Sequence, residues 1–289
     1  MIDKPQSIVD YWRFKQRMRL RQFDVLFAVQ ACFRANFLYP LIRAKRKIGF
    51  DLLRAKDCHR WVINETIAPG HDHTVDGFLK FADALGLAKK DIRWDLPILP
   101  ADELWAKTHL PNTTAPIVLV NPAASKPERS WVIDRYIAVI KHLQSRWQAH
   151  VVLTGGPSVY DKTLGDAIVN AVPSVTNLIG KTVPKQLLAV IAQADLMLCP
   201  DTGPSHMGAA VTTPVVALHA VTSKEVSGPY IYRHIAVDCY PEAVKTVLNS
   251  TIDANIWGLQ AHGPNTMKLV SVANVIAQLD DVLAGIEQQ

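Results

Sequence analysis

The chain has 289 residues, which suits two domains of ordinary size, and its 49% hydrophobic and 20% charged residues indicate a folded globular protein rather than a disordered one. No apolar run reaches the roughly 18 residues of a membrane-spanning helix, and the N-terminus lacks the order of segments of a signal peptide, so we expect a cytoplasmic protein. The four cysteines are widely spaced without a C-x-x-C pair, which indicates reduced thiols and neither a zinc site nor a disulfide scaffold.

Positive charge is concentrated at the N-terminal end. Residues 1–60 hold 14 Lys or Arg against 5 Asp or Glu, a local net charge of +9, whereas the whole chain carries +5, so the remainder sums to −4. This asymmetry predicts that the N-terminal part faces an anionic partner such as membrane headgroups, a phosphorylated substrate or nucleic acid, or else that it is a solvated helix face. Because basic and aromatic residues do not interleave in the way that stacks bases, nucleic acid is not the expected partner.

The N-terminal third gives a weak pattern of secondary structure. We expect a basic helix, then strands over 23–30 and 46–50, and then a helix over 75–87 that Gly86 ends. The proline-rich stretch that follows is typical of a linker. We therefore predict an N-terminal domain over 1–95 and a linker over 96–115.

From residue 116 onward, short apolar runs alternate with longer amphipathic ones. Strands are expected at 116–121, 150–154, 176–180, 195–200, 214–220 and 234–238, and helices at 131–148, 158–171, 184–193, 204–211 and 241–249. Strands that are apolar throughout, separated by helices, indicate a parallel sheet covered on both faces, which is a doubly wound α/β domain. This domain is predicted over 116–267, and a C-terminal helical segment over 268–289.

The sequence "CPDTGPSHMGAA" places a polar cluster after the strand at 195–200. Ligands of parallel α/β sheets collect at the carboxyl ends of strands. If Pro204 is the first helical residue, Gly203 is the N-cap, and the amides of Ser205 and His206 point outward unpaired as an anion site, with the His206 side chain able to donate as well. The alternative is that Asp201 and Thr202 only cap the helix and that His206 is structural.

The pattern D-[ST]-G-x-x-H, followed by small residues and an apolar strand, resembles the family 9 glycosyltransferases, the bacterial lipopolysaccharide heptosyltransferases. Further similar stretches are "RANF", "RKIGFD", "HTVDGFLKFADALGL", "NPAASKPERSW", "LTGGP", "LIGKTVPKQLLAVIAQADLMLCPDTGPSHMGAA" and "VTSKEVSGPY". The resemblance implies a GT-B fold, with two Rossmann-like domains of which the N-terminal one is shortened. It also implies use of an ADP-sugar without a metal or other cofactor.

The same resemblance implies roles for individual residues. A hydroxyl and basic residues in the loop after 116–121 would face the donor diphosphate, and these are Ser125, Lys126 and Arg129. The polar cluster would complete the donor site with Asp201, Thr202, Gly203, Ser205 and His206. The adenine would be bordered by Lys181, Thr182 and Val183, and the ribose side by Gly155, Gly156 and Asp161, although Tyr160 aligns equally well with the family's acidic residue.

Other ligand motifs fit the sequence poorly. "GKTVP" at 180–184 is not a P-loop, because Val175 stands where that motif needs glycine. His71 and His73 lack a third ligand, so we expect no metal site. A nicotinamide-dependent oxidoreductase is disfavoured because no G-x-G-x-x-G follows any predicted strand.

Members of the family open with a strand and a Gly-Asp-containing loop that supplies the general base. This sequence opens with "MIDKPQSIVDYWRFKQRMRLRQFDVLFAVQ" and resembles the family only from about a quarter of the way into that domain, so the catalytic base is expected to lie in a segment absent here. Gln30 and Arg34, near the end of the first predicted strand, are the candidates for the acceptor side.

Two functional hypotheses follow from the resemblance. The first is an inverting transferase that moves heptose from an ADP-sugar to an anionic lipopolysaccharide core acceptor, with peripheral contact at the inner face of the inner membrane. The second is a nucleotide-sugar-binding remnant or partner subunit that lacks the general base and does not turn over.

Overall fold

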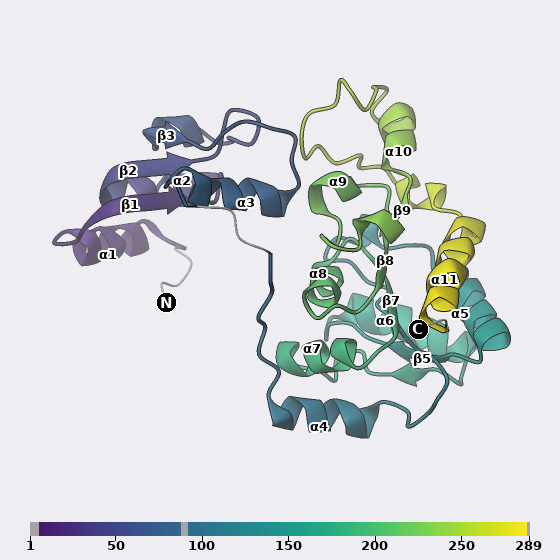
Figure 1. Cartoon of the computed structure of the whole chain (residues 1–289). Helices are drawn as coiled ribbons and strands as arrows, with labels where there is room; N and C mark the ends of the chain where they lie inside the picture. The colour runs from purple at the N-terminus through teal and green to yellow at the C-terminus, as the bar shows by residue number, and fades with distance from the viewer. Residues whose placement is uncertain (1–5, 88–91, 288–289) are drawn as a thin grey trace. The chain divides into compact units, whose positions relative to one another are not determined.

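The computed structural model describes residues 6–87 and 92–287, which form two compact units. The N-terminal unit comprises residues 1–91 together with 256–258, and the C-terminal unit comprises 92–255 and 259–289 (Figure 1). Each unit contains one sheet, and every strand pair in both sheets is parallel among the described residues.

The N-terminal unit is a three-stranded sheet in the order β1-β2-β3. In chain order its elements are α1 (Ile8–Met18), β1 (Gln22–Ala28), α2 (Phe33–Asn36), the 3₁₀ turn η1 (Tyr39–Leu41), β2 (Arg43–Gly49), the 3₁₀ turn η2 (His59–Trp61), β3 (Glu65–Thr66) and α3 (Thr74–Asp83). The predicted strands and helices are present, but α2, β3 and the 3₁₀ turns were missed, because elements of two to four residues carry no periodic signal.

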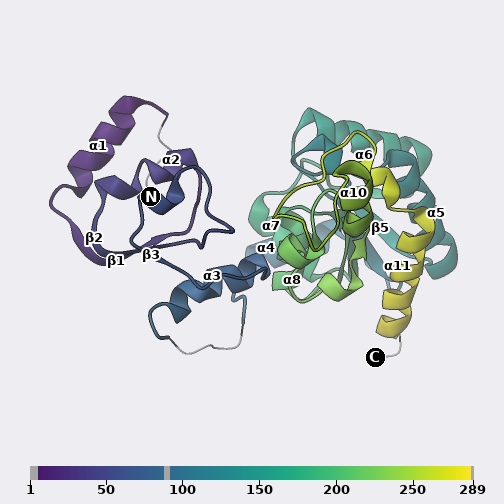
Figure 2. The same cartoon turned by 90° about the horizontal axis from the view of Figure 1, so that it is seen from above.

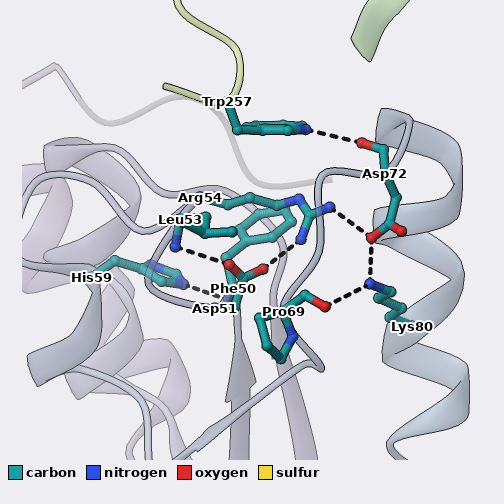
Figure 3. Close-up of polar contacts among 9 residues, drawn as sticks. All are labelled: Phe50, Asp51, Leu53, Arg54, His59, Pro69, Asp72, Lys80 and Trp257. Carbon is teal, nitrogen blue, oxygen red and sulfur yellow. Dashed lines mark hydrogen bonds and ion pairs between the residues drawn. The ribbon is translucent and has the colours of Figure 1, made fainter. Parts of the chain in front are cut away.

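Buried polar groups hold the carboxyl end of β2 in place (Figure 3). The guanidinium of Arg54 pairs with the carboxylates of Asp51 and Asp72, and the Lys80 ammonium also pairs with Asp72. The indole of Trp257 lies 4.8 Å from the Arg54 guanidinium and donates to the Asp72 carbonyl at 2.9 Å. Both Asp51 and Arg54 are buried, so each charge depends on its partners.

The C-terminal unit is a six-stranded sheet in the order β6-β5-β4-β7-β8-β9. Its strands are β4 (Ile117–Val120), β5 (His150–Leu153), β6 (Thr176–Asn177), β7 (Leu196–Pro200), β8 (Val215–His219) and β9 (Val237–Asp238). Its helices are α4 (Pro100–His109), α5 (Ile133–Trp147), α6 (Val159–Ala171), α7 (Pro184–Ala192), α8 (Gly203–Ala210), α9 (Lys224–Ser227), α10 (Tyr240–Val247) and α11 (Val272–Glu287), with 3₁₀ turns η3 (Pro127–Arg129), η4 (Arg233–Ile235) and η5 (Thr266–Leu269).

Helices cover both faces of this sheet (Figure 2). Side chains alternate between the two faces along each strand, so that Leu198 joins the core beneath α5, α6 and α11, while Met197 joins the core beneath α4, α7 and α8. All five residues of β7 and of β8 are buried. The apolar runs in the sequence arise from this two-sided burial.

Two segments differ from the predicted domain organisation. The stretch 96–115, expected to be a linker, contains α4, and Ala106 of that helix is fully buried in the core that includes Leu119 and Val190. Residues 256–258, expected within the C-terminal domain, group with the N-terminal unit, where Trp257 contacts Arg54. Neither contact is visible in a local pattern, because both join segments distant in sequence.

Over residues 6–87 and 92–287, no helix combines the length and the apolar character needed to cross a bilayer.

Candidate functional site

The order of strands brings two loops of the C-terminal unit together. β4 lies between β5 and β7, so the chain moves from β4 towards one edge of the sheet and later returns to the other side of β4. Such a reversal leaves a crevice at the carboxyl ends of the two adjacent strands, where ligands of open α/β sheets bind. The loops in question are 121–132, after β4, and 201–202, after β7.

Arg129 links these two loops. Its Nη2 donates to Ser125 Oγ at 3.0 Å within the β4 loop, and its Nη1 lies 3.4 Å from Oδ2 of Asp201 at the end of β7. The Arg129 Nε–H is buried without a partner among the described residues. Lys126, at the start of the η3 turn, is exposed. Three of the predicted donor residues therefore lie in direct contact, and Lys126 lies nearby in the same loop.

Helix α8 begins one residue earlier than predicted. Thr202 is the N-cap, with extended backbone (φ −154°, ψ 164°), and Gly203 is the first helical residue. The expectation of an unpaired Ser205 amide is wrong, because both the amide and the hydroxyl of Ser205 donate to the Thr202 carbonyl, at 3.0 and 2.6 Å. Ser205 is buried and secures the start of the helix.

The free amide at the start of α8 is instead that of Gly203. Its amide is the first of the helix and donates to no atom of the described residues. A Cβ added at Gly203 would meet nothing within 4 Å, so space is open at this point. A free amide at a helix N-terminus with open space before it suits an anionic group.

His206 lies in the first turn of α8, with its side chain reaching the surface. Surrounding protein lowers the pKa of the imidazole, and the nearby Asp201 carboxylate partly opposes that shift. A neutral imidazole can both donate and accept a hydrogen bond.

Sequence reasoning missed two residues that interact with Asp201, one by a hydrogen bond and one electrostatically. Ser227 of α9 donates to Asp201 Oδ2 at 3.1 Å, so that carboxylate has two partners from distant segments. His219, at the end of β8, is fully buried, and its Nδ1 lies 3.2 Å from the Thr222 carbonyl, while Nε2 has no partner among the described residues. Burial lowers the pKa of His219, opposed by Asp201 and by Asp238 on β9. The only sequence signal was the unusual position of His219 at the end of an apolar run.

A second group of predicted residues follows β5 and β6. The Gly180 amide donates to the Gly155 carbonyl at 3.0 Å, which ties the two loops together. Asp161 accepts from the Gly156 amide at 2.8 Å and from the Ser158 hydroxyl, so its carboxylate is engaged within its own loop.

The predicted adenine-bordering residues lie just before α7. Lys181 Nζ donates to the Asn177 carbonyl at 2.8 Å, Thr182 is half-buried, and Val183 is an exposed apolar N-cap residue. Val183 therefore presents an exposed apolar side chain close in sequence to Gly180, which joins the loops after β5 and β6.

The two predicted acceptor-side residues lie in the N-terminal unit, and both are exposed. Gln30 follows β1, and its backbone exchanges hydrogen bonds with the Tyr39 hydroxyl at 3.2 and 3.0 Å. Arg34 is in α2, and its carbonyl accepts from the Tyr11 hydroxyl at 3.2 Å.

The two histidines that were not expected to bind a metal, His71 and His73, differ in their surroundings. His73 is buried as the N-cap of α3, where Nδ1 accepts from the Val75 amide, whereas His71 is exposed. Within residues 6–87 and 92–287, no group of three or more His, Cys, Asp or Glu side chains is arranged to hold a metal ion.

Comparison with known sequences gives one family. The model for glycosyltransferase family 9 (heptosyltransferase) matches residues 11–251. The lipopolysaccharide core heptosyltransferase OpsX of Haemophilus influenzae is 30% identical over 278 residues, which cover 95% of this chain and 78% of that protein. Lipopolysaccharide heptosyltransferase 3 of Escherichia coli is 33% identical over 213 residues, covering 71% of this chain and 61% of that protein.

Solved structures show the same fold. A family 9 glycosyl transferase from Veillonella parvula superposes with a TM-score of 0.73 at 17% identity, covering 97% of this chain and 81% of that one. The E. coli ADP-heptose heptosyltransferase II gives 0.66 at 18% identity, covering 96% and 81%. The predicted GT-B type of α/β fold is therefore confirmed. Because the family model spans most of the chain and OpsX aligns over nearly all of it, the chain belongs to glycosyltransferase family 9, the heptosyltransferase family.

Proposed function

We propose that this protein transfers a heptose from ADP-heptose to a lipopolysaccharide core acceptor, with inversion and without a metal. A hydroxyl of the acceptor attacks the anomeric carbon from the side opposite the diphosphate. The new C–O bond forms as the bond from that carbon to the β-phosphate oxygen breaks, and ADP leaves with the electron pair. The hydroxyl proton passes to a general base that none of the predicted residues supplies.

The observation that carries the proposal is the position of Arg129, between Ser125 and Asp201 at the strand reversal. ADP carries growing negative charge as it leaves, and fixed donors placed where that charge develops lower the barrier. Arg129, Lys126, the Ser125 hydroxyl and the Gly203 amide are the donors that would face it. Two cationic side chains and a helix N-terminus can provide the stabilisation that a metal provides in other transferases.

Asp201 has a supporting role in this proposal. Its Oδ2 is held by Arg129 and Ser227, so the carboxylate keeps the guanidinium in place until the diphosphate arrives. His206, in the first turn of α8, would donate to a phosphate or sugar oxygen, and Thr202 would line the same turn.

The nucleoside would lie towards β5 and β6. The exposed side chain of Val183 can pack on the adenine, with the backbone of Lys181 and Thr182 at the ring edge. The glycines at 155 and 156 allow the ribose to approach the backbone closely. Asp161 accepts hydrogen bonds from Gly156 and Ser158. Its role would be to hold this loop in the conformation that meets the ribose.

The acceptor would be met by the basic N-terminal unit. Gln30 and Arg34 are its candidate contacts, and the net charge of +9 over residues 1–60 suits the anionic lipopolysaccharide core and the inner face of the inner membrane. The protein would act in the cytoplasm, at that surface.

The first test is calorimetry with ADP, followed by transfer from ADP-heptose to heptose-deficient lipopolysaccharide. Arg129→Gln should weaken ADP binding about 10- to 100-fold, because a hydrogen-bonded charge pair contributes about 1.5–3 kcal/mol. Arg129→Lys should recover part of that loss, since it keeps the charge but not the planar fork. Lys141→Gln, at an exposed position on α5, is the matched control and should bind as the wild type does.

Other outcomes would contradict parts of the proposal. ADP binding without turnover on any acceptor would leave a nucleotide-sugar-binding remnant or partner subunit. Binding of NAD in place of ADP would point to an oxidoreductase. ADP affinity that is unchanged in Arg129→Gln would remove the proposed diphosphate site.

A further inference from the structure

The N-terminal unit exposes apolar side chains on two neighbouring helices. Ile8 and Trp12 of α1 are 88% and 60% exposed, and Phe33 of α2 and its C-cap residue Phe37 are 57% and 64% exposed. These four residues are called the α1–α2 patch below. Large apolar side chains gathered on one surface usually mark a contact site.

Direct contacts join the two halves of this patch. The Tyr11 ring packs edge-on against Phe37, with 6.3 Å between ring centroids, and the Tyr11 hydroxyl donates to the Arg34 carbonyl. Ile8 and Trp12 are four residues apart on α1, and the C-cap residue Phe37 is four residues after Phe33, the first residue of α2. Each pair therefore shares one face of its helix. The patch therefore spans both elements.

Helix α1 is fixed in the orientation that exposes these residues. Phe14 and Met18 are buried on its inner face, and Ser7 and Asp10 form a capping box at its start. Turning Ile8 and Trp12 inward would expose Phe14 and Met18, so the apolar outer face belongs to the folded state.

Exposed positive charges lie on and beside the two helices that carry the patch. Among the described residues, Arg13 pairs with Asp10 at 3.6 Å, but no ion pair is formed by five other basic side chains on or beside the two helices: Lys15, Arg17, Arg19, Arg21 and Arg34. All five are exposed. The partner that fits this surface must be anionic over a wide area and must also accept apolar side chains.

An anionic bilayer has both properties. Trp and Phe side chains settle at the boundary between headgroups and acyl chains, while Lys and Arg remain among the anionic headgroups. Aliphatic side chains distinguish a bilayer from a nucleic acid, because exposed Ile8 and Leu20 have no ring to stack on a base but do partition into acyl chains.

We propose that the α1–α2 patch and its basic border are a docking surface for a bilayer rich in anionic phospholipid. This inference rests on the proposed function in one respect, because a lipid-anchored acceptor makes contact with a bilayer useful. It goes further in naming the surface and the ligand chemistry. Docking depends on the N-terminal unit, whereas donor binding depends on the C-terminal unit, so either can fail without the other.

The test is sedimentation of the full chain with vesicles of phosphatidylcholine, with or without phosphatidylglycerol. We expect binding to the anionic vesicles that weakens with added salt, and much weaker binding to phosphatidylcholine alone. Lys15→Gln with Arg19→Gln should lower the affinity more than tenfold, because each basic residue near an anionic surface contributes about fivefold. Ile8→Ser with Trp12→Ser should lower it about tenfold or more.

Insertion can be separated from electrostatic attraction. Vesicles with brominated acyl chains should quench part of the tryptophan fluorescence, and that part should vanish in Trp12→Phe, which keeps an apolar ring. Val159→Ser and Lys141→Gln, both at exposed positions of the C-terminal unit, are the matched controls and should bind vesicles as the wild type does.

Three results would overturn the proposal. The first is an absence of vesicle binding in a chain that binds ADP. The second is vesicle binding that the α1 substitutions leave unchanged. The third is self-association or binding to RNA that the same substitutions abolish while vesicles are ignored, which would assign the surface to another partner. Loss of ADP binding with vesicle binding retained would instead contradict the proposed function alone.

Discussion

The two units use different means to fold around a parallel sheet. In the C-terminal unit, every residue of β7 and β8 is buried, and helices cover both faces. In the N-terminal unit, β1 is an edge strand with only Ala28 fully buried, and the carboxyl end of β2 is held by buried ion pairs and hydrogen bonds. The first sheet is stabilised by apolar burial, and the second depends more on a few polar contacts.

This difference matches the roles proposed for the two units. A diphosphate site needs donors held in fixed positions, and a sheet whose interior strands β7 and β8 are buried throughout provides a rigid base for them. A surface that meets a bilayer must keep apolar and charged side chains exposed, which leaves less material for a core. The predictions below test this contrast, from the largest expected effect to the smallest.

Removing the buried cation of the N-terminal unit should have the largest effect. Arg54→Met would leave Asp51 charged and buried without its partner, which typically costs about 3–5 kcal/mol. Hydrogen exchange should then show faster opening of β2 while β7 remains protected. Asp24→Asn, which removes an exposed ion pair with Lys45, is the control and should leave exchange unchanged.

Truncating a side chain should cost more stability in the C-terminal sheet than in the N-terminal sheet. Leu198→Ala, in the fully buried strand β7, should lower the free energy of unfolding by about 2–5 kcal/mol. Phe23→Ala, on the edge strand β1 with 38% of the side chain exposed, should cost about 1 kcal/mol or less. Urea unfolding of both variants measures this, and equal losses would contradict the contrast between the sheets.

Each unit should also lose stability in mild acid through one buried histidine. Burial lowers the pKa of His59 in the N-terminal unit and of His219 in the C-terminal unit. The unfolded chain, with a pKa of about 6.5, then binds the proton more readily, so stability is present above that pH and falls as the pH drops below it.

The slope should reach at most about 1.4 kcal/mol per pH unit for each histidine. His59 has both ring nitrogens engaged, by the Phe50 amide and the Asn36 side chain, so protonation would also break a hydrogen bond. Urea midpoints measured on either side of pH 6.5 should change less steeply in His219→Gln. An unaltered slope in that variant would show that His219 does not titrate on unfolding.

The smallest effect on stability is expected at the start of α8. Gly203→Ala meets no atom within 4 Å and should change the free energy of unfolding by about 1 kcal/mol or less. It should nevertheless weaken ADP binding, because a methyl group would occupy the space proposed for phosphate. Gly208→Ala in the same helix is the contrasting variant, since its Cβ would lie 2.4 Å from Val215 and should destabilise the unit.

Much of the site was predictable because its signals are local. The apolar run of β7, the polar cluster after it and the small residues of α8 are neighbours in sequence, so Asp201 was expected at a strand end before a helix. Their fine geometry was not, because whether Thr202 or Gly203 is the N-cap depends on the backbone conformation of Thr202, which the residue types leave open.

The sequence by itself determined the class of fold, the order of the main elements and the motifs of the family, because periodicity and short motifs are properties of adjacent residues. Only the tertiary structure decided that Arg129 reaches Asp201, that Ser227 donates to Asp201, that α4 joins the C-terminal core and that Trp257 packs on Arg54. Each of these contacts joins segments far apart along the chain, and strand order, which brings such segments together, is fixed by the burial of the whole sheet rather than by any local run of residues.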